Sequence, residues 1–159
     1  MMSTKKAAGS SAAWKWVFWI YLLLLILFVV IKFHGSISAL LRQMEEQRGY
    51  REVGAGSYLN LTPFVTIKSQ LRHLPAPWAV RNLVGNVLCF IPFGLLLPLA
   101  HRHLRTFFRV MLLALVMICA IEVFQYVTCL GSCDVDDLIL NLLGCLAGWL
   151  CWLPLKRGS

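Results

Sequence analysis

The stretch from Ile121 to Gly148, IEVFQYVTCLGSCDVDDLILNLLGCLAG, decides the fold of this chain. Two long apolar runs flank its polar centre, and a charge at or inside a hydrocarbon layer is costly unless it is paired or hydrated. Acids in such a setting are candidates for function rather than ordinary surface residues. The stretch holds four of the seven acidic residues of the chain, namely Glu122, Asp134, Asp136 and Asp137.

Helical spacing places these acids on defined faces. Glu122 and Gln125 are three residues apart, so they share one face of a helix. A second stripe follows in steps of three and four residues, and its last two members form a G-x3-G pair that lets helices approach closely. This stripe consists of Asp134, Asp137, Asn141, Gly144 and Gly148.

The composition indicates an integral membrane protein. The 159 residues are 59% hydrophobic and 14% charged, with a mean hydropathy of +0.73, whereas soluble domains are about 45–50% apolar and about 25% charged. The net charge of +8 comes from basic residues at the edges of apolar runs and in one connecting segment, where they anchor helices to anionic headgroups. No basic-aromatic binding motif accompanies them, so we exclude nucleic acid as a partner.

The apolar runs predict an all-α bundle of four transmembrane helices near 16–33, 82–100, 110–130 and 138–154. A disordered cytoplasmic tail (1–15) precedes this single membrane domain (16–154), and a basic tail (155–159) follows it. The alternative for the first span, a cleaved signal peptide, conflicts with its long core and with the lack of a prompt cleavage site. Pro92 predicts a kink in the second span.

The segment between the first two spans, residues 32–81, is predicted to lie outside the cell or in the periplasm. Its first part can form a short amphipathic helix that ends at Gly54 to Gly56. In its second part, Pro63, Pro75 and Pro77 forbid a long helix, and the apolar residues favour the membrane interface.

Basic residues set the orientation. The N-terminal tail, the turn after the second span and the C-terminus are all basic, and the loop between the last two spans has no Lys or Arg. The positive-inside rule therefore places both termini in the cytoplasm. Residues 32–81, which carry seven Lys or Arg, argue against this orientation, but they form the longest loop and also contain Glu45, Glu46 and Glu52.

In this topology the polar residues converge near the outer surface and predict one ligand-binding pocket. Simpler roles remain open: Asp134 can cap the last helix with Asp136 and Asp137 in its first turn, and Asn86 and Asn141 can bridge helices. Glu122 is protonated, bonded to an amide, or facing something cationic. The predicted set is Asn82, Asn86, Glu122, Gln125, Asp134, Asp136, Asp137 and Asn141.

Resident metals and cofactors are not expected. The D-x-D-D acids have oxygen ligands suited to a divalent cation at Asp134, Asp136 and Asp137, but helix capping explains them more simply. Of the six cysteines, four lie in apolar runs, and Cys129 and Cys133 flank a loop. A lone C-x3-C without a nearby His is weak support for zinc, so we expect two unpaired thiols.

Three blocks of the sequence resemble the VanZ-like family of bacterial membrane proteins over about residues 58–150. They are YLNLTPFVTI, NLVGNVLCFIPFGLLLPLA and the opening stretch, which supply N-x3-N-x3-F-x-P-x-G, E-x2-Q and D-x-D-D-x3-N in the family's order. Beside the polar set, the resemblance and the helical spacing assign structural roles to Asn60, Pro63, Phe64, Pro92, Gly94, Gly144 and Gly148.

One departure from the family pattern concerns an Arg that members often carry shortly before the D-x-D-D acids. This chain has Gly131-Ser132-Cys133 there. If that Arg normally pairs with an acid, its partner here comes from elsewhere, such as Arg81, or the acids are freer to bind a cation.

The resemblance implies a multi-pass protein of the bacterial cytoplasmic membrane, and the family's founding member is linked to low-level teicoplanin resistance. We expect a non-enzymatic envelope protein that binds a lipid or lipid-linked cell-wall precursor at the outer leaflet and influences glycopeptide susceptibility. One alternative is an intramembrane enzyme acting on a headgroup through the Glu/Asp cluster, but none of the four His residues lies in the three blocks. The other is a small proton-coupled carrier, for which four short helices line only a narrow path unless they form a homo-oligomer.

Overall fold

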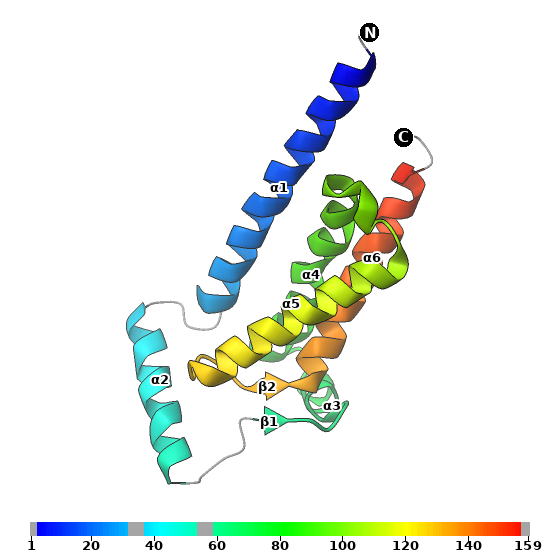
Figure 1. Ribbon diagram of the computed structural model, residues 1–159. Coiled ribbons are helices and arrows are strands. Elements are labelled where there is room, and N and C mark those ends of the chain that lie inside the picture. The colour runs from blue at the N-terminus through cyan, green and yellow to red at the C-terminus, as the bar shows by residue number, and fades with distance from the viewer. Residues whose placement is uncertain (1–2, 32–36, 54–58, 157–159) are drawn as a thin grey trace.

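The computed structural model describes residues 3–31, 37–53 and 59–156, and the described chain is almost entirely helical (Figure 1). The two strands are only two residues long, and a short 3-10 turn, η1 (Arg102–Leu104), follows α4. The elements in chain order are α1 (Ser3–Ile31), α2 (Ile37–Glu52), β1 (Leu59–Asn60), α3 (Val65–Arg72), α4 (Pro77–Ala100), α5 (Phe107–Val127), β2 (Cys133–Asp134) and α6 (Val135–Lys156).

Three of the described helices, α4, α5 and α6, are long and apolar enough to cross a membrane. The apolar part of α1, Ala12–Phe28, is shorter. Many large side chains on these helices remain exposed, such as Leu112, Leu143 and Leu150, as expected for surfaces that face lipid. The structure therefore fits the all-helical membrane protein that the composition indicates.

The centre of the fold is the contact between α4 and α6, where glycines bring two backbones together. A Cβ on Gly144 would lie 2.0 Å from the Val87 carbonyl oxygen, and one on Gly148 would lie 1.9 Å from that of Ile91. Gly94 makes the reciprocal approach from α4, because its Cβ would meet the Cys145 carbonyl oxygen at 1.9 Å. Only glycine permits so close a packing of two helices.

The other two long helices pack against this pair through buried apolar side chains. On α1, Phe18 packs against Phe93 with 5.8 Å between ring centroids, and the Tyr21 hydroxyl donates to the Cys89 carbonyl at 2.7 Å. The core also contains small and branched residues of α5, Val110, Ala114 and Ile118.

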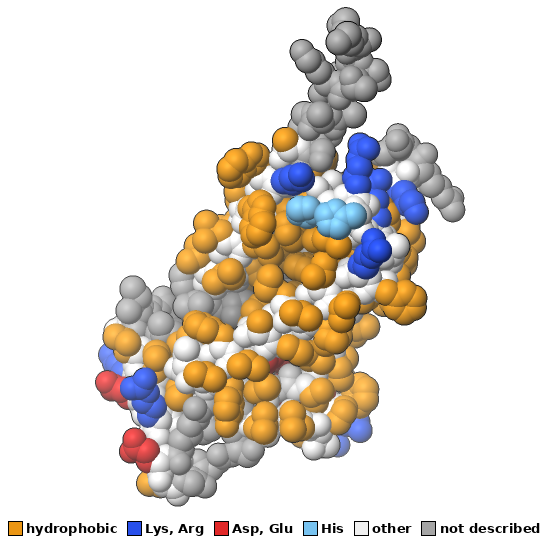
Figure 2. Space-filling view, in the orientation of Figure 1, with side chains coloured by type: hydrophobic (Ala, Val, Ile, Leu, Met, Phe, Trp, Pro, Cys, Tyr) orange, Lys and Arg blue, Asp and Glu red, His pale blue; other side chains and the backbone are white. Residues whose placement is uncertain are grey.

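The helices alternate in direction, so the structure has two distinct ends (Figure 1). The start of α1, η1 and the end of α6 lie at one end, which we call the basic end because Lys15, Arg102, Arg105, Arg109 and Lys156 belong to it. Figure 2 shows the Lys, Arg and His side chains of this end gathered together. Here Arg105 lies over the Trp152 ring at 5.8 Å, and its Nε donates to the Pro98 carbonyl. The strands and α3 lie at the opposite end, which we call the strand end.

Several boundaries differ from those predicted. The first helix already begins at Ser3, because the segment expected to be a disordered tail has no proline and its Ala and Lys residues let the apolar helix continue toward the N-terminus. Helix α4 begins at Pro77 rather than at residue 82, since proline is well suited to the first helical position. Its two internal prolines, Pro92 and Pro98, both lie within the continuous helix. The expected helix end at Gly54 to Gly56 lies outside the described residues.

Candidate functional site

Strands β1 and β2 bring together two sequence blocks that are far apart in the chain. They pair in parallel, with Leu59 opposite Cys133 and Asn60 opposite Asp134. The Asn60 side chain accepts from the Thr62 N–H at 3.1 Å, which forms the turn before Pro63. Its amide donates to Asp134 Oδ1 at 3.1 Å, so the first block is attached directly to the acids.

Asp134 is the junction between β1, α3 and α6. Its Oδ1 also accepts from the Asp136 N–H at 2.8 Å, so it caps the start of α6 as the simpler alternative supposed. Its Oδ2 accepts from the Thr66 hydroxyl of α3 at 2.5 Å. Three donors from three segments therefore hold one buried carboxylate.

Asp136 is fully buried and faces α3. Its Oδ1 accepts from the Phe64 N–H at 2.5 Å, and its Oδ2 accepts from the Ile67 N–H at 3.0 Å. N–H groups at the start of a helix have no acceptor within that helix. Asp136 of α6 supplies the acceptors here and therefore caps α3. The cap coincides with a left-handed backbone at Phe64, whose φ is 67°.

Asp137 faces α4, where it meets both asparagines of the second sequence block. Its Oδ1 accepts from Asn86 at 2.6 Å and from Asn82 at 3.2 Å. The three aspartates of D-x-D-D thus accept hydrogen bonds from three different sets of donors. Within the described ranges, no group of three or more His, Cys, Asp or Glu side chains is arranged to hold a metal ion.

At the end of α5, Glu122 and Gln125 are both buried. Glu122 Oε2 accepts from the Asp134 N–H at 3.2 Å, which connects α5 to β2. The Gln125 carbonyl accepts from the Leu130 and Gly131 N–H groups, and Cys129, just before Leu130, has a φ of 59°. This helix ending turns the chain back toward the aspartates.

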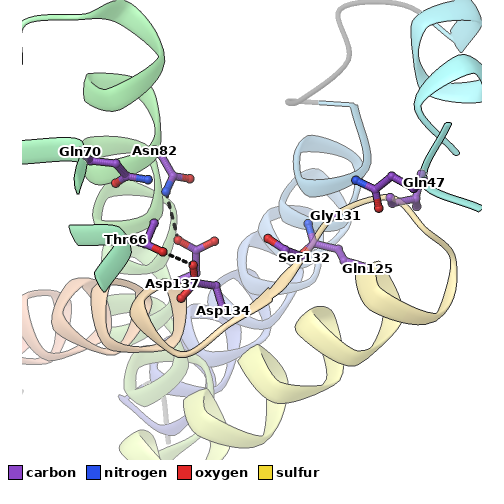
Figure 3. Close-up of a pocket in the computed structure, with 10 residues that line it drawn as sticks. Gln47, Thr66, Gln70, Asn82, Gln125, Gly131, Ser132, Asp134 and Asp137 are labelled. Atoms are coloured by element: carbon purple, nitrogen blue, oxygen red, sulfur yellow. Dashed lines mark hydrogen bonds between the residues drawn. The ribbon is translucent and has the colours of Figure 1, made fainter. Parts of the chain in front are cut away.

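A polar pocket of about 430 Å³ opens beside these contacts at the strand end. In Figure 3, Thr66, Gln70, Asn82, Asp134 and Asp137 form one side of it, and Gln47, Gln125, Gly131 and Ser132 lie across from them. Its charged lining residues are two carboxylates, and no Lys, Arg or His belongs to the described lining. The complete lining is Gln47, Thr66, Gln70, Asn82, Gln125, Leu130, Gly131, Ser132, Asp134 and Asp137.

Two glutamines of the pocket carry amide oxygens that lack donors. Within the part of the chain that the structure describes, the buried Oε1 atoms of Gln47 and Gln70 have no hydrogen-bond partner. Gln70 is only 5% exposed, although it belongs to the short helix α3. A buried polar atom without a partner costs about 1–3 kcal/mol, which a bound ligand or water can recover.

The predicted site residues divide into two groups. Asn82, Gln125, Asp134 and Asp137 line the pocket, whereas Asn86, Glu122, Asp136 and Asn141 are buried but do not belong to its lining. Arg81, suggested as a partner for the acids, is exposed on α4. In the described structure Cys129 and Cys133 do not form a disulfide, as expected.

Sequence reasoning missed six lining residues. Leu130, Gly131 and Ser132 lie in the loop after α5, and Gln47, Thr66 and Gln70 lie on α2 and α3. Thr66 and Gln70 are four residues apart and therefore share one face of α3. That spacing indicates a shared helical face, but the surrounding prolines argue against a long helix and leave room only for one as short as α3. Gln47 gave no signal, because its helix carries polar residues throughout.

The comparisons with known proteins concern the family of the chain. The chain is similar to Protein VanZ from Enterococcus faecium, with 33% identity over 90 residues, which cover 57% of this chain and 49% of that protein. The chain therefore matches about half the length of this relative. No solved structure matches it. A model of the VanZ/LLP1 family matches residues 18–156, and the chain therefore belongs to this family.

Proposed function

We propose that this chain is a non-enzymatic membrane protein of the bacterial cell envelope. It spans the cytoplasmic membrane four times with both termini in the cytoplasm. At the outer leaflet it holds the headgroup of a lipid or lipid-linked cell-wall precursor, and it thereby influences susceptibility to glycopeptides such as teicoplanin. Family membership supports the envelope role, and the separation of the basic end from the strand end supports the orientation.

The observation that carries the proposal is the polar pocket at the strand end. Its volume of about 430 Å³ falls within the range of about 300–1,000 Å³ typical of small-molecule sites. It therefore accommodates a headgroup rather than a complete lipid. Because α2, α3 and the two strands surround the ends of the long helices, the pocket lies where a headgroup of the outer leaflet would meet it.

Apolar grooves along the helices offer surfaces for acyl chains. One lies between α1 and α4 and is lined by residues such as Leu24, Phe28 and Leu88. Another lies between α5 and α6 and includes Leu112, Ile139 and Leu143. A polar pocket at one end of apolar grooves suits an amphiphile better than a water-soluble ligand.

A binding role is favoured over an enzyme by how the fold uses the acids. Asp134 and Asp136 accept hydrogen bonds from backbone and side-chain donors that hold β1 and α3 in place. A general base needs a lone pair directed at the substrate, and the described lining of the pocket contains no His, Cys or Lys to act beside these acids.

The test is to identify and displace the bound lipid. We would purify the protein in detergent, analyse the co-purified lipid by mass spectrometry, and add back the enriched species to nanodisc-embedded protein. Ser132→Trp fills the pocket from an exposed lining position, and Ser69→Trp adds the same bulk on α3 outside the lining. We expect at least a tenfold loss of binding for Ser132→Trp alone, with a matching loss of growth under teicoplanin.

Two results would contradict the proposal. Wild-type protein that carries only the bulk lipid mixture would exclude a lipid-headgroup site. The second result is turnover of a labelled lipid by the purified protein. If Ser132→Trp abolishes this turnover and Ser69→Trp retains it, the protein is an enzyme rather than a binding protein.

A further inference from the structure

We propose that the polar pocket recognises a primary ammonium group, so that the preferred headgroup carries an amine and its phosphate stays outside. This inference rests on the proposed function, because it names the chemical class of headgroup that the same pocket would hold. It follows from the distribution of donors, acceptors and charges over the lining.

The lining is rich in acceptors and carries negative charge. Asp134 and Asp137 are its charged residues, and neither Lys, Arg nor His occurs in the described lining. Two carboxylates close together favour a cation between them and disfavour a second anion. A phosphate would require Arg, Lys or a set of free N–H groups.

The side-chain donors near the carboxylates are already directed at them. Asn82 and Asn86 donate to Asp137, and the Thr66 hydroxyl donates to Asp134. An ionised carboxylate offers about four lone-pair sites, so these bonds leave it able to accept from a ligand as well. The carboxylates therefore keep the capacity to accept from a donor of the headgroup.

The second, independent observation comes from the two glutamines. Among the residues that the structure describes, no donor reaches the buried Oε1 atoms of Gln70 and Gln47, and the two side chains belong to facing sides of the pocket (Figure 3). The terminal torsion of a glutamine is broad, so each amide oxygen can turn toward a ligand at little cost. An ammonium group has three N–H donors and no acceptor, which matches two amide oxygens and a carboxylate.

The test compares headgroups that differ only in the amine. Protein in nanodiscs without amine lipids would be titrated with dihexanoyl phosphatidylethanolamine, with its N-acetylated form, with free ethanolamine and with inorganic phosphate. We expect the amine lipid to bind at least tenfold more tightly than the N-acetylated lipid and phosphate to show no binding. Free ethanolamine should bind weakly and competitively, because it lacks the acyl chains.

Charge variants at the glutamines test the site itself. Gln70→Lys places a competing ammonium in the pocket, and Ser69→Lys adds the same charge at the exposed neighbouring position. We expect Gln70→Lys to weaken binding of the amine lipid at least tenfold and Ser69→Lys to change it less than twofold. Gln47→Lys on the other side of the pocket should repeat the result, which keeps the test decisive if Gln70→Lys misfolds.

The outcomes separate this inference from the proposed function. Saturable binding of lipids without preference for the amine, or binding of phosphate, would overturn the ammonium site and leave lipid binding intact. Free ethanolamine binding as tightly as the lipid would retain the ammonium site and contradict a lipid source. If none of the probes reaches saturation, the ammonium site is overturned. The proposed function is tested separately, by the identity of the lipid that co-purifies.

Discussion

Asp136 shows at the scale of a single residue how an acid can serve the fold of a membrane protein. It is fully buried and accepts from the Phe64 and Ile67 N–H groups. Those two bonds are charge-assisted, and they fix the start of α3 and thereby the position of Gln70 in the pocket. An acid that sequence spacing grouped with ligand-binding residues instead positions a segment that builds the pocket.

Asp136→Asn tests this role. An Asn side chain offers only one acceptor oxygen, and its NH₂ group would face a backbone N–H. We expect a loss of about 2–3 kcal/mol, seen as a fall in Tm of roughly 5–10 °C in detergent. The exposed Glu45→Gln on α2 is the control and should leave Tm unchanged. Equal Tm values for both variants would show that the α3 cap is energetically unimportant.

Glu122 separates folding from function. In the described chain its Oε2 accepts a hydrogen bond from the Asp134 N–H. In Glu122→Gln, the amide oxygen can still accept that bond, so we expect normal expression and Tm. Loss of teicoplanin tolerance in this variant would assign function to the charge or proton of Glu122. Glu122→Ala should lose the same function and also about 1–3 kcal/mol of stability. A fully tolerant Gln variant would give Glu122 a purely structural role.

At the scale of elements, the α4–α6 contact organises the molecule. Glycines on both helices let backbone touch backbone, and the same two helices carry the Asn82, Asn86 and Asp137 contacts at the strand end. A shift of α6 away from α4 would therefore also lengthen those hydrogen bonds. Packing along the middle of α4 and α6 and pocket geometry at the strand end are coupled through these rigid helices.

Gly144→Ala and Gly148→Ala test the coupling. Each new Cβ would clash with a backbone carbonyl oxygen, at 2.0 Å from Val87 or 1.9 Å from Ile91, and a backbone cannot move aside as a flexible side chain can. We expect each substitution to destabilise the protein by about 3 kcal/mol or more. Gly49→Ala on α2 is the matched control, because nothing lies within 4 Å of its Cβ, and it should be neutral or stabilising by about 0.5–1 kcal/mol. Thermal unfolding of the three variants decides whether the close approach matters.

At the scale of the whole molecule, the two ends differ in charge and chemistry. The basic end gathers Arg102, Arg105 and Arg109 around the end of α6, and the strand end holds the buried acids and the pocket. Under the positive-inside rule the pocket faces outward, so Cys133 on β2 should be reachable from outside the cell.

Cysteine labelling in intact cells tests this topology. With the other five cysteines replaced, a membrane-impermeant maleimide should label Cys133 from outside. Burial, followed by the charge of Glu122, raises the pKa of the Cys133 thiol above its ordinary value. The reactive thiolate is therefore scarcer at neutral pH than in an ordinary cysteine, and the labelling rate should rise as pH increases.

The matched control is Thr106→Cys at the exposed start of α5 in a background without native cysteines. It should label only after permeabilisation. The reverse pattern, with position 106 labelled in intact cells and Cys133 protected, would invert the molecule and place the pocket in the cytoplasm.

The sequence by itself determined the class of the protein, its family and three of the membrane helices. Apolar runs long enough to span a bilayer are a local property, so α4, α5 and α6 were predicted to within a few residues, and the comparisons confirmed the VanZ-like resemblance. The fourth span and the orientation stay predictions, since the apolar part of α1 described by the structure is shorter. The start of α4 differs from the predicted one, because proline is favoured at the first position of a helix and α4 begins at Pro77.

Only the tertiary structure decided which donor each acid receives. The β1–β2 pairing joins two residues to two others more than seventy positions away, and so short a pair leaves no periodic signal in the sequence. Because that pairing places α3 against α6, Asp136 turns to the Phe64 and Ile67 N–H groups, and Thr66 and Gln70 reach the pocket. Helical spacing can place side chains on a common face of one helix. Which other segment meets that face depends on contacts between residues distant in the chain, and these exist only once the chain has folded.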